Sequence, residues 1–505
     1  MDNRILKGNI FTMTGEGIRA EAAGITDGVI KAVGTLEGVK NTMPTGTEVT
    51  DYGNSLIVPG LVDTHMHPLV TGLTLSGVDL SEARSLGEVI TLLSRRAKDT
   101  RPGEWVIGTR FQDKRLEERR FPTLEELDEL TLRHPVMVLH NDIHFLQMNT
   151  PGMKRLFPGV SKAGSPPGYF EDPEAVNIIE GFMEDLSPEE KVDYMRDVCS
   201  LAPARGLTGL HVKEVWENLK PLLEIENSLN IRLKPMVFAL STEDPGIEAV
   251  LEDPILRRRA VICLINDGTL DGHTAALLEP YTDQPEIRAE TIFSDTELER
   301  FLRRAFDAGV QASIHAVGDA TIEQILRVTE RVLPDFYGID HRLRIEHFEM
   351  PAPGQIERAV RLGITAGVQP MFIPVCQGMD YSGYRPFVGD RVYRANTFKS
   401  YMDAGMLIAG GSDSPVTPLD PFQGIAAALC HPTPEERLSF YEALSLYTTK
   451  AARIAFEENS TGTIEPGKQA DLTVIEYNHD SDGVLPGKED LRAVYRGGIR
   501  VFGAD

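Results

Sequence analysis

The feature that most constrains the fold is a set of eight short apolar segments, each ending where polar residues begin. They are Leu61–His67, Leu207–Lys213, Leu233–Leu240, Ala260–Asp267, Val310–Val317, Leu343–Glu349, Ile364–Pro370 and Met406–Asp413. Stretches of helical character separate most of these segments, and that alternation is typical of parallel βαβ units. Eight is the number of parallel strands that closes a barrel. We therefore predict an α/β chain built on a (β/α)8 TIM barrel.

Three further regions flank or interrupt the predicted barrel of residues 59–457. Residues 1–58 and 458–505 contain short strand-like runs between Gly, Asp and Asn turns, and chain termini commonly lie close together. They predict one small discontinuous β-sandwich domain. Residues 72–205, after the first barrel strand, are too long and too structured for a loop. We predict that they form an inserted lid subdomain over the barrel mouth.

Charge and cysteine content limit the partners and the compartment. The formal net charge of −25 at pH 7 argues against binding to nucleic acid or to an anionic membrane surface. The first residues lack an apolar run of signal-peptide length, and no later run approaches a membrane span. Four cysteines in 505 residues do not suggest a disulfide framework. We expect a reduced, cytoplasmic protein with a small-molecule substrate, and a homo-oligomer remains possible.

A His-x-His pair, His65 and His67, ends the first predicted barrel strand within the run VPGLVDTHMH. Side chains at positions i and i+2 of a strand point the same way, so both imidazoles can face the barrel interior. Neutral imidazole is a common ligand for zinc and related metals. The pair alone is a weak signal for a metal site.

Three later residues strengthen that signal. His315 ends the fifth predicted strand, His347 the sixth and Asp413 the eighth, each at the rim where barrel enzymes build their sites. Five metal-competent side chains at four strand ends predict a metal centre. The alternative is a structural barrel with hydrogen-bonded core histidines and a turn aspartate.

The order His-x-His, His, His, Asp on strands one, five, six and eight resembles that of the amidohydrolase superfamily. Several runs of this sequence resemble motifs of one branch of that superfamily, the YtcJ-like proteins and N-substituted formamide deformylases (amidohydrolase family 3). These runs are VPGLVDTHMH, DGTLDGHTAALLEPY, SIHAVGD, RIEHFE, GSDSPVTPLDPF and NDIHFLQMN. The resemblance implies that His65, His67 and Asp413 hold one metal ion. It implies that His315 and His347 hold a second ion or contact the substrate and its attacking water. The expected cofactor is a divalent metal, zinc, with one or two ions per chain.

Cys263 is a departure from the pattern that the resemblance implies. Many members of the superfamily place a lysine on strand four, four residues before an Asp-Gly pair, and that lysine bridges two metals after carboxylation. The corresponding position here, counted back from Asp267, is Cys263. A thiolate can ligate or bridge zinc, so we predict that Cys263 is a metal ligand. Alternatively it is a small buried apolar residue, as most free cysteines are.

Two other histidines are candidates for substrate binding. His144 lies in the inserted region, in the run NDIHFLQMN, and His273 lies in the loop after the fourth predicted strand. For each, a packed or hydrogen-bonded structural histidine is the competing interpretation.

Together with the metal-competent residues, the resemblance implies a metal-dependent hydrolase of a non-peptide carbon–nitrogen bond of the N-acyl or N-formyl amide type. Asp413 would act as general base towards a metal-activated water and then as general acid towards the departing nitrogen. Two alternatives remain open. The same metal could serve an isomerase, lyase or decarboxylase, or the barrel could be a non-catalytic binding protein. The sequence does not specify the substrate.

Overall fold

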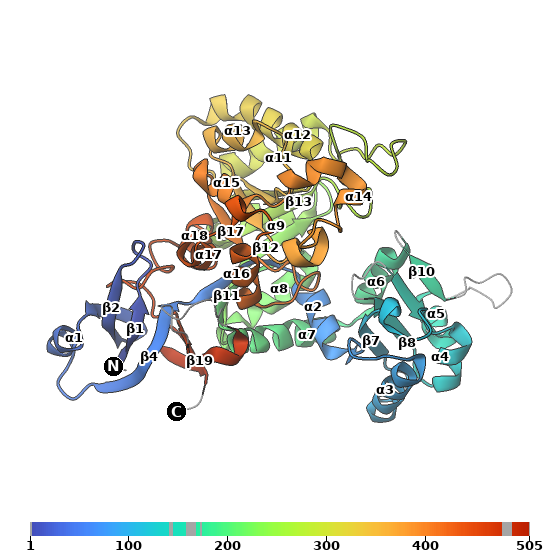
Figure 1. Cartoon of the computed structure of the whole chain (residues 1–505), viewed down its shortest axis with the longest axis horizontal. Helices are drawn as coiled ribbons and strands as arrows, with labels where there is room; N and C mark the ends of the chain where they lie inside the picture. Colours follow the sequence, from blue (N-terminus) through green and yellow to red (C-terminus); the bar gives the residue numbers. More distant parts are fainter. Residues whose placement is uncertain (1–2, 141–144, 158–167, 172–173, 477–486, 504–505) are drawn as a thin grey trace. The chain divides into compact units, whose positions relative to one another are not determined.

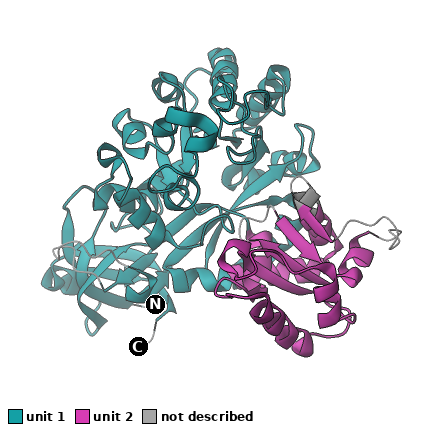
Figure 2. Ribbon diagram, turned by 45° about the vertical axis from the view of Figure 1, so that its right-hand side comes forward, with its two compact units in different colours: residues 1–67, 199–505 teal, residues 68–198 magenta. Residues whose placement is uncertain are grey.

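A computed structural model describes residues 3–140, 145–157, 168–171, 174–476 and 487–503. It contains the predicted barrel and two further sheets (Figure 1). By contacts between Cα atoms the chain divides into two compact units, residues 1–67 with 199–505, and residues 68–198, coloured separately in Figure 2.

The barrel of the larger unit is an eight-stranded parallel sheet in the order β17-β16-β15-β14-β13-β12-β11-β5. Its strands are β5 (Leu61–Met66), β11 (Leu207–Val215), β12 (Arg232–Ala239), β13 (Val261–Ile265), β14 (Gln311–Ala316), β15 (Arg344–His347), β16 (Thr365–Val368) and β17 (Ile408–Gly410). Each of the eight predicted segments overlaps one of these strands, so the predicted (β/α)8 architecture is confirmed. The observed strands are mostly shorter because several predicted segments run into the loops that follow them.

The seam between β5 and β17 is closed by the residues that follow β17. The Asp413 amide donates to the His65 carbonyl at 2.8 Å, and the His67 amide donates to the Ser414 carbonyl at 2.9 Å. Met66 and Ser414 form a parallel bridge. The closure therefore lies at the carboxyl ends of the strands, beside the predicted metal ligands.

Helices follow the barrel strands as a (β/α)8 chain requires. The longest of those in the larger unit are α11 (Asp295–Ala308) and α12 (Asp319–Val332), which precede β14 and β15. In α11, Ser294 and Glu297 form a capping box, and Gly309 ends the helix at a φ of +67°. The other helices of the larger unit are α1 (Leu36–Thr42), α8 (Trp216–Glu224), α9 (Pro245–Glu252), α10 (Pro254–Arg259), α13 (Gln355–Arg361), α14 (Arg385–Val388), α15 (Phe398–Asp403), α16 (Pro421–Leu429), α17 (Phe440–Leu446) and α18 (Thr449–Ile454).

Both ends of the chain build one seven-stranded sheet, in the order β20-β19-β18-β4-β1-β2-β3. The amino-terminal strands are β1 (Asn3–Phe11), β2 (Arg19–Thr26), β3 (Val29–Gly34) and β4 (Glu48–Pro59), and the carboxyl-terminal ones are β18 (Leu472–Ile475), β19 (Leu491–Arg496) and β20 (Ile499–Phe502). Strand β4 pairs with β1 on one side and β18 on the other. Apolar side chains from both ends, such as Ile57 and Val474, share one core.

The smaller unit has its own five-stranded sheet, β10-β9-β8-β7-β6. Its strands are β6 (Val78–Asp79), β7 (Val106–Phe111), β8 (Val136–His140), β9 (Phe145–Met148) and β10 (Tyr169–Glu171). Its helices are α2 (Pro68–Ser76), α3 (Leu86–Asp99), α4 (Leu124–Leu130), α5 (Thr150–Leu156) and α6 (Glu174–Asp185), and α7 (Pro188–Leu201) leads back to the larger unit. A separate apolar core includes Val89, Leu93, Val106 and Val138. The predicted insertion of residues 72–205 covers most of this unit, and its role as a lid stays a prediction.

No helix in the described part of the chain is long and apolar enough to cross a membrane.

Candidate active site

His65, His67 and Asp413 lie together at the carboxyl end of the barrel. One donor atom from each lies within 4.8 Å of the others. The Nε2 atoms of His65 and His67 are each 3.2 Å from Oδ1 of Asp413. His65 is fully buried, Asp413 is 7% exposed, and Nε2 of His65 has no hydrogen-bond partner of suitable geometry. Two imidazole nitrogens and a carboxylate with one unsatisfied buried nitrogen fit a divalent cation.

The backbone around Asp413 explains how β17 delivers this side chain to β5. Gly411 stands two residues before Asp413. A Cβ atom at Gly411 would lie 2.7 Å from the backbone nitrogen of His65, so the glycine allows the two chain segments to approach. Asp413 itself has a φ of +54°, in the left-handed region that is unfavourable for residues other than glycine. Such conformations cluster at functional sites, where the surrounding structure holds them in place.

His315 and His347 lie beside the group of three without being part of it. The His347 ring centroid is 5.3 Å from that of His65 and 4.4 Å from that of His315. Burial and the neighbouring His315 hold the pKa of His347 well below its usual value, so its imidazole is neutral. Its Nδ1 is buried without a hydrogen-bond partner. The two rings could therefore receive a second cation or a polar group of a substrate.

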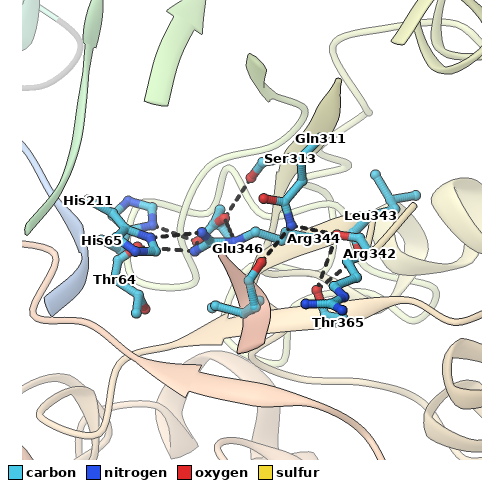
Figure 3. A network of polar contacts seen from close by, with 12 residues as sticks. Thr64, His65, His211, Gln311, Ser313, Arg342, Leu343, Arg344, Glu346 and Thr365 are labelled. Carbon is cyan, nitrogen blue, oxygen red and sulfur yellow. Dashed lines mark hydrogen bonds and ion pairs between the residues drawn. The ribbon is translucent and has the colours of Figure 1, made fainter. Parts of the chain in front are cut away.

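A buried ion pair orients His65 (Figure 3). Nδ1 of His65 lies 2.8 Å from Oε2 of Glu346, which leaves Nε2 for a metal. Arg344 donates a hydrogen bond to Oε2 of that carboxylate at 3.1 Å, its Nε lies 2.9 Å from Oε1 as an ion pair, and the Ser313 hydroxyl donates to Oε1 at 2.6 Å. Gly367 makes room for the pair, because a Cβ atom there would overlap the Glu346 carboxylate.

Arg344 also ties this pair to the opposite side of the barrel. Its guanidinium donates to Nδ1 of His211 on β11 at 3.2 Å and to the Thr64 carbonyl on β5 at 3.1 Å. Burial and the Arg344 charge hold the pKa of His211 well below its usual value, so it can accept this hydrogen bond as a neutral ring. Both charges of the ion pair thus have several hydrogen bonds, which a fully buried pair requires.

Asp267 has an analogous relation to His315. Its Oδ1 lies 3.2 Å from Nδ1 of His315. The same carboxylate accepts hydrogen bonds from the Val317 and Gly318 amides at 3.1 and 2.9 Å and from the Thr321 hydroxyl at 2.7 Å. It is therefore held in place by the start of α12 and can fix the orientation of the His315 ring.

The carboxylates of the site favour positive charge at its centre. Burial alone would raise the pKa of Asp413, but its contacts with His65 and His67 hold it well below its usual value. Burial would also raise the pKa of Glu346, and Arg344 and His65 hold it low. Burial and the Lys213 charge oppose protonation of His65, yet Asp413 and Glu346 outweigh them and raise its pKa. Anions that favour a proton on His65 would favour a metal cation at the same place.

Cys263 lies on β13 and is not a member of the group formed by His65, His67 and Asp413. It is 1% exposed and packs with Met236 and Val261. Burial raises the pKa of its thiol to about 12, which keeps it protonated until a cation approaches. These contacts agree with the interpretation of a small buried residue, and the metal-ligand role of Cys263 stays a prediction.

Of the two histidines predicted to bind substrate, the structure describes His273 only. Nε2 of His273 lies 2.9 Å from Oδ2 of Asp283, at hydrogen-bond distance, and the His273 ring contacts Tyr281 and Phe387. No contact between His273 and the five metal-competent residues is found in the described part of the chain, and its role towards a substrate stays a prediction. His144 lies outside the described residues.

Sequence reasoning missed the residues that orient the ligands, namely Glu346, Arg344 and Asp267. Glu346 and Arg344 stand in the same short run as His347, RIEHFE, and Asp267 opens the run DGTLDGHT. Charged residues within an otherwise apolar strand could have pointed to these roles. Such residues are almost never buried without partners, so each indicates a specific interaction.

Comparison with known proteins agrees with this geometry. The model of the amidohydrolase family matches residues 48–498. YtcJ of Bacillus subtilis is 28% identical over 502 residues, which cover 93% of each chain. N-substituted formamide deformylase of Arthrobacter pascens is 25% identical, over 94% of this chain and 93% of that protein. The solved structure of an uncharacterized metal-dependent hydrolase from Pyrococcus horikoshii has a TM-score of 0.80 at 25% identity and covers 94% of this chain and 98% of that one. The resemblance inferred from the sequence motifs is thereby confirmed, and the chain belongs to the amidohydrolase family.

Proposed function

We propose that the protein is a metal-dependent hydrolase of a non-peptide carbon–nitrogen bond, acting on a small N-acyl or N-formyl amide. The observation that carries this proposal is the group of His65, His67 and Asp413 at the barrel rim, in which the buried Nε2 of His65 has no hydrogen bond of suitable geometry. Family membership and the metal-dependent hydrolase of similar structure support the reaction class. The deformylase relative supports an amide substrate.

His65, His67 and Asp413 would hold the metal, which we propose to be zinc because two imidazoles and a carboxylate are ligands that it favours. Such an ion lowers the pKa of a water molecule and polarises a carbonyl oxygen. His315 and His347 would hold a second ion or contact the substrate carbonyl. Cys263 stays a further proposed ligand.

Asp413 is the proposed proton carrier. A carboxylate has two oxygens, so one can bind a cation while the other accepts a proton from the attacking water. Oxygen of that water forms a bond to the amide carbon, and Asp413 then passes the proton to the nitrogen as the carbon–nitrogen bond breaks. The products are a carboxylic acid and an amine. The low pKa of Asp413 ensures that it begins the cycle as a carboxylate.

The experiment that tests this proposal is turnover of N-formyl and N-acyl amides by zinc-loaded protein in water enriched in oxygen-18. Hydrolysis places one labelled oxygen in the acid product and releases a free amine. Conversion of a substrate without label in the product would instead indicate an isomerase, lyase or decarboxylase. Failure of the zinc-loaded protein to convert any member of a broad amide panel would contradict the proposal.

The cytoplasmic location, the absence of nucleic-acid and membrane partners, and the oligomeric state stay predictions.

A further inference from the structure

Lys213 is a buried cation on the inner face of the barrel. It lies on β11, two residues after His211, whose ring accepts a hydrogen bond from Arg344 of β15 across the barrel. Side chains two residues apart in a strand share a face, so Lys213 also points inward. Val212 pairs with Met66, which places Lys213 next to the strand end that carries His67. Lys213 and the proposed metal ligands therefore share one end of the barrel interior.

The amine of Lys213 extends towards the carboxyl ends of the strands. In the sheet, Lys213 is in register with Met236, yet its Nζ lies 5.6 Å from the ring centroid of Phe238, two residues further along β12. Lys213 is only 2% exposed.

No anion among the described residues forms an ion pair with this amine. Throughout the described residues, Nζ of Lys213 has no hydrogen bond and no ion pair, and it lies 5.6 Å from the centroid of the Phe238 ring. Glu346 is committed to Arg344, His65 and Ser313, and Asp413 to His65 and His67. The other buried lysine of the barrel, Lys234, donates to the Ala455 carbonyl at 2.7 Å. Burial of a cation without a partner is costly, and it is retained where a ligand supplies the missing charge.

We propose that Lys213 binds a carboxylate group of the substrate. This inference rests on the proposed function for the amide half of that substrate and adds that the substrate is an acid. A divalent cation held by two neutral imidazoles and one carboxylate leaves positive charge at the site, and Lys213 adds another. A substrate carboxylate balances that excess. Neighbouring strands are about 5 Å apart, so the carboxylate must lie within a few bonds of the amide that is cleaved.

Binding measurements test this proposal without requiring turnover. A panel of N-formyl amino acids is compared by calorimetry with the matching N-formyl amino acid amides, which have the same shape but no charge. Loss of a charged hydrogen bond costs roughly 10- to 100-fold in affinity, so the wild-type protein should prefer the acids by about that factor. Lys213→Met should abolish the preference, and Lys213→Arg should keep part of it.

Lys234→Met is the matched control. It removes a buried barrel lysine whose partner is a backbone carbonyl, and the preference for acids should remain. Lys213→Met should also raise the free energy of unfolding of the ligand-free protein, because it removes an unpaired buried charge, and should leave the metal content unchanged. A structural role for Lys213 would give the opposite change in stability.

Three results would overturn the proposal. Equal affinity of the wild type for acids and amides would do so, as would a preference that persists in Lys213→Met. Loss of metal in Lys213→Met together with a carbon-13 signal of a carbon dioxide adduct on Lys213 would show that the lysine serves the metal instead. If acids bind through Lys213 but no amide is hydrolysed, the proposed function fails while this inference stands. If neutral amides are hydrolysed and acids are not preferred, the proposed function stands while this inference fails.

Discussion

Glu346 determines which nitrogen of His65 is available to a metal. Its carboxylate lies 2.8 Å from Nδ1, and the ring therefore presents Nε2 to Asp413 and to the site centre. Residues that orient a ligand in this way affect metal affinity although they never touch the ion. Their contribution can be separated from that of the ligands by substitution.

For Glu346→Gln we expect metal affinity to fall by roughly 10- to 100-fold, because the amide orients His65 less firmly. The free energy of unfolding should fall by about 3 kcal/mol, since Arg344 is left as an unpaired buried charge. Chelator competition and urea denaturation measure the two effects. Glu323→Gln, at a partly exposed carboxylate that contacts Arg358 and Gln355, is the control and should change neither metal affinity nor the fold. Unchanged metal affinity in Glu346→Gln would remove Glu346 from the site.

Asp413→Asn tests the proposed proton carrier. An amide oxygen can still ligate a cation but cannot accept and return a proton, so turnover should fall by at least about 100-fold while the circular dichroism spectrum is unchanged. Asp403→Asn, at an exposed ion pair with Lys399, should retain full activity. Retention of most of the wild-type rate by Asp413→Asn would exclude Asp413 as the acid–base group.

Cys263→Ser tests the predicted soft ligand. Serine has nearly the same size, so packing against Met236 and Val261 is kept while the sulfur is lost. If Cys263 binds zinc, the number of zinc ions per chain found by elemental analysis should fall. Unchanged zinc content and activity would leave Cys263 as part of the apolar core.

His347 could be predicted as a site residue from the sequence, whereas its neighbour Glu346 could not. Strand alternation places neighbouring residues on opposite faces, so the pattern that points His347 into the site points Glu346 away from it. In the structure both residues contribute to the site, and His347 has a φ of +73°, a left-handed conformation at the end of the strand. A local backbone conformation of this kind depends on the surrounding fold and leaves no mark in the periodicity.

At the scale of elements, the barrel strands were predictable because each is a short apolar run with a polar residue at its end. Strand ends were less so: β17 stops at Gly410, yet the predicted segment continues to Asp413. The site depends on that difference, because Asp413 reaches His65 from the loop and not from the strand. The inner face of the barrel is also more polar than the pattern suggested, with Lys234 of β12 among its buried residues.

Lys234 should make stability depend on pH. Burial lowers the pKa of this lysine from 10.5 to about 8 in the folded chain. Between these values the unfolded chain binds more protons, so the free energy of unfolding should rise with pH, by up to about 1.4 kcal/mol per pH unit. The gain in the free energy of unfolding is complete above the pKa of the unfolded chain. It is lost as the pH falls through the pKa of Lys234 in the folded chain. Urea denaturation of wild type and Lys234→Met across this range measures the difference, and parallel curves would contradict the assignment.

At the scale of the whole molecule, the division into two units could be predicted from the interruption between the first and second barrel strands. The smaller unit, residues 68–198, has its own sheet and apolar core. Its relation to the barrel mouth depends on interactions that no local pattern in the sequence encodes.

We expect residues 68–198 to fold when expressed alone, because a compact unit with a separate core can generally do so. The isolated segment should show a mixed helix and strand spectrum by circular dichroism and a cooperative transition in urea. Val138→Asp, which places a charge in its core, is the matched control and should abolish that transition. A disordered spectrum for the unsubstituted segment would show that the unit depends on the rest of the chain.

The seven-stranded sheet built from both ends of the chain imposes an order on folding during synthesis. Strand β4 lies between β1 and β18, and β18 is made roughly 400 residues later, which at 5–20 residues per second is on the order of half a minute. During that interval one edge of β4 has no partner, and β5 likewise waits for β17 to close the barrel. Unpaired strand edges readily recruit other strands. The nascent chain therefore has a long period in which misassembly competes with folding, and slower elongation or higher temperature should increase aggregation before release from the ribosome.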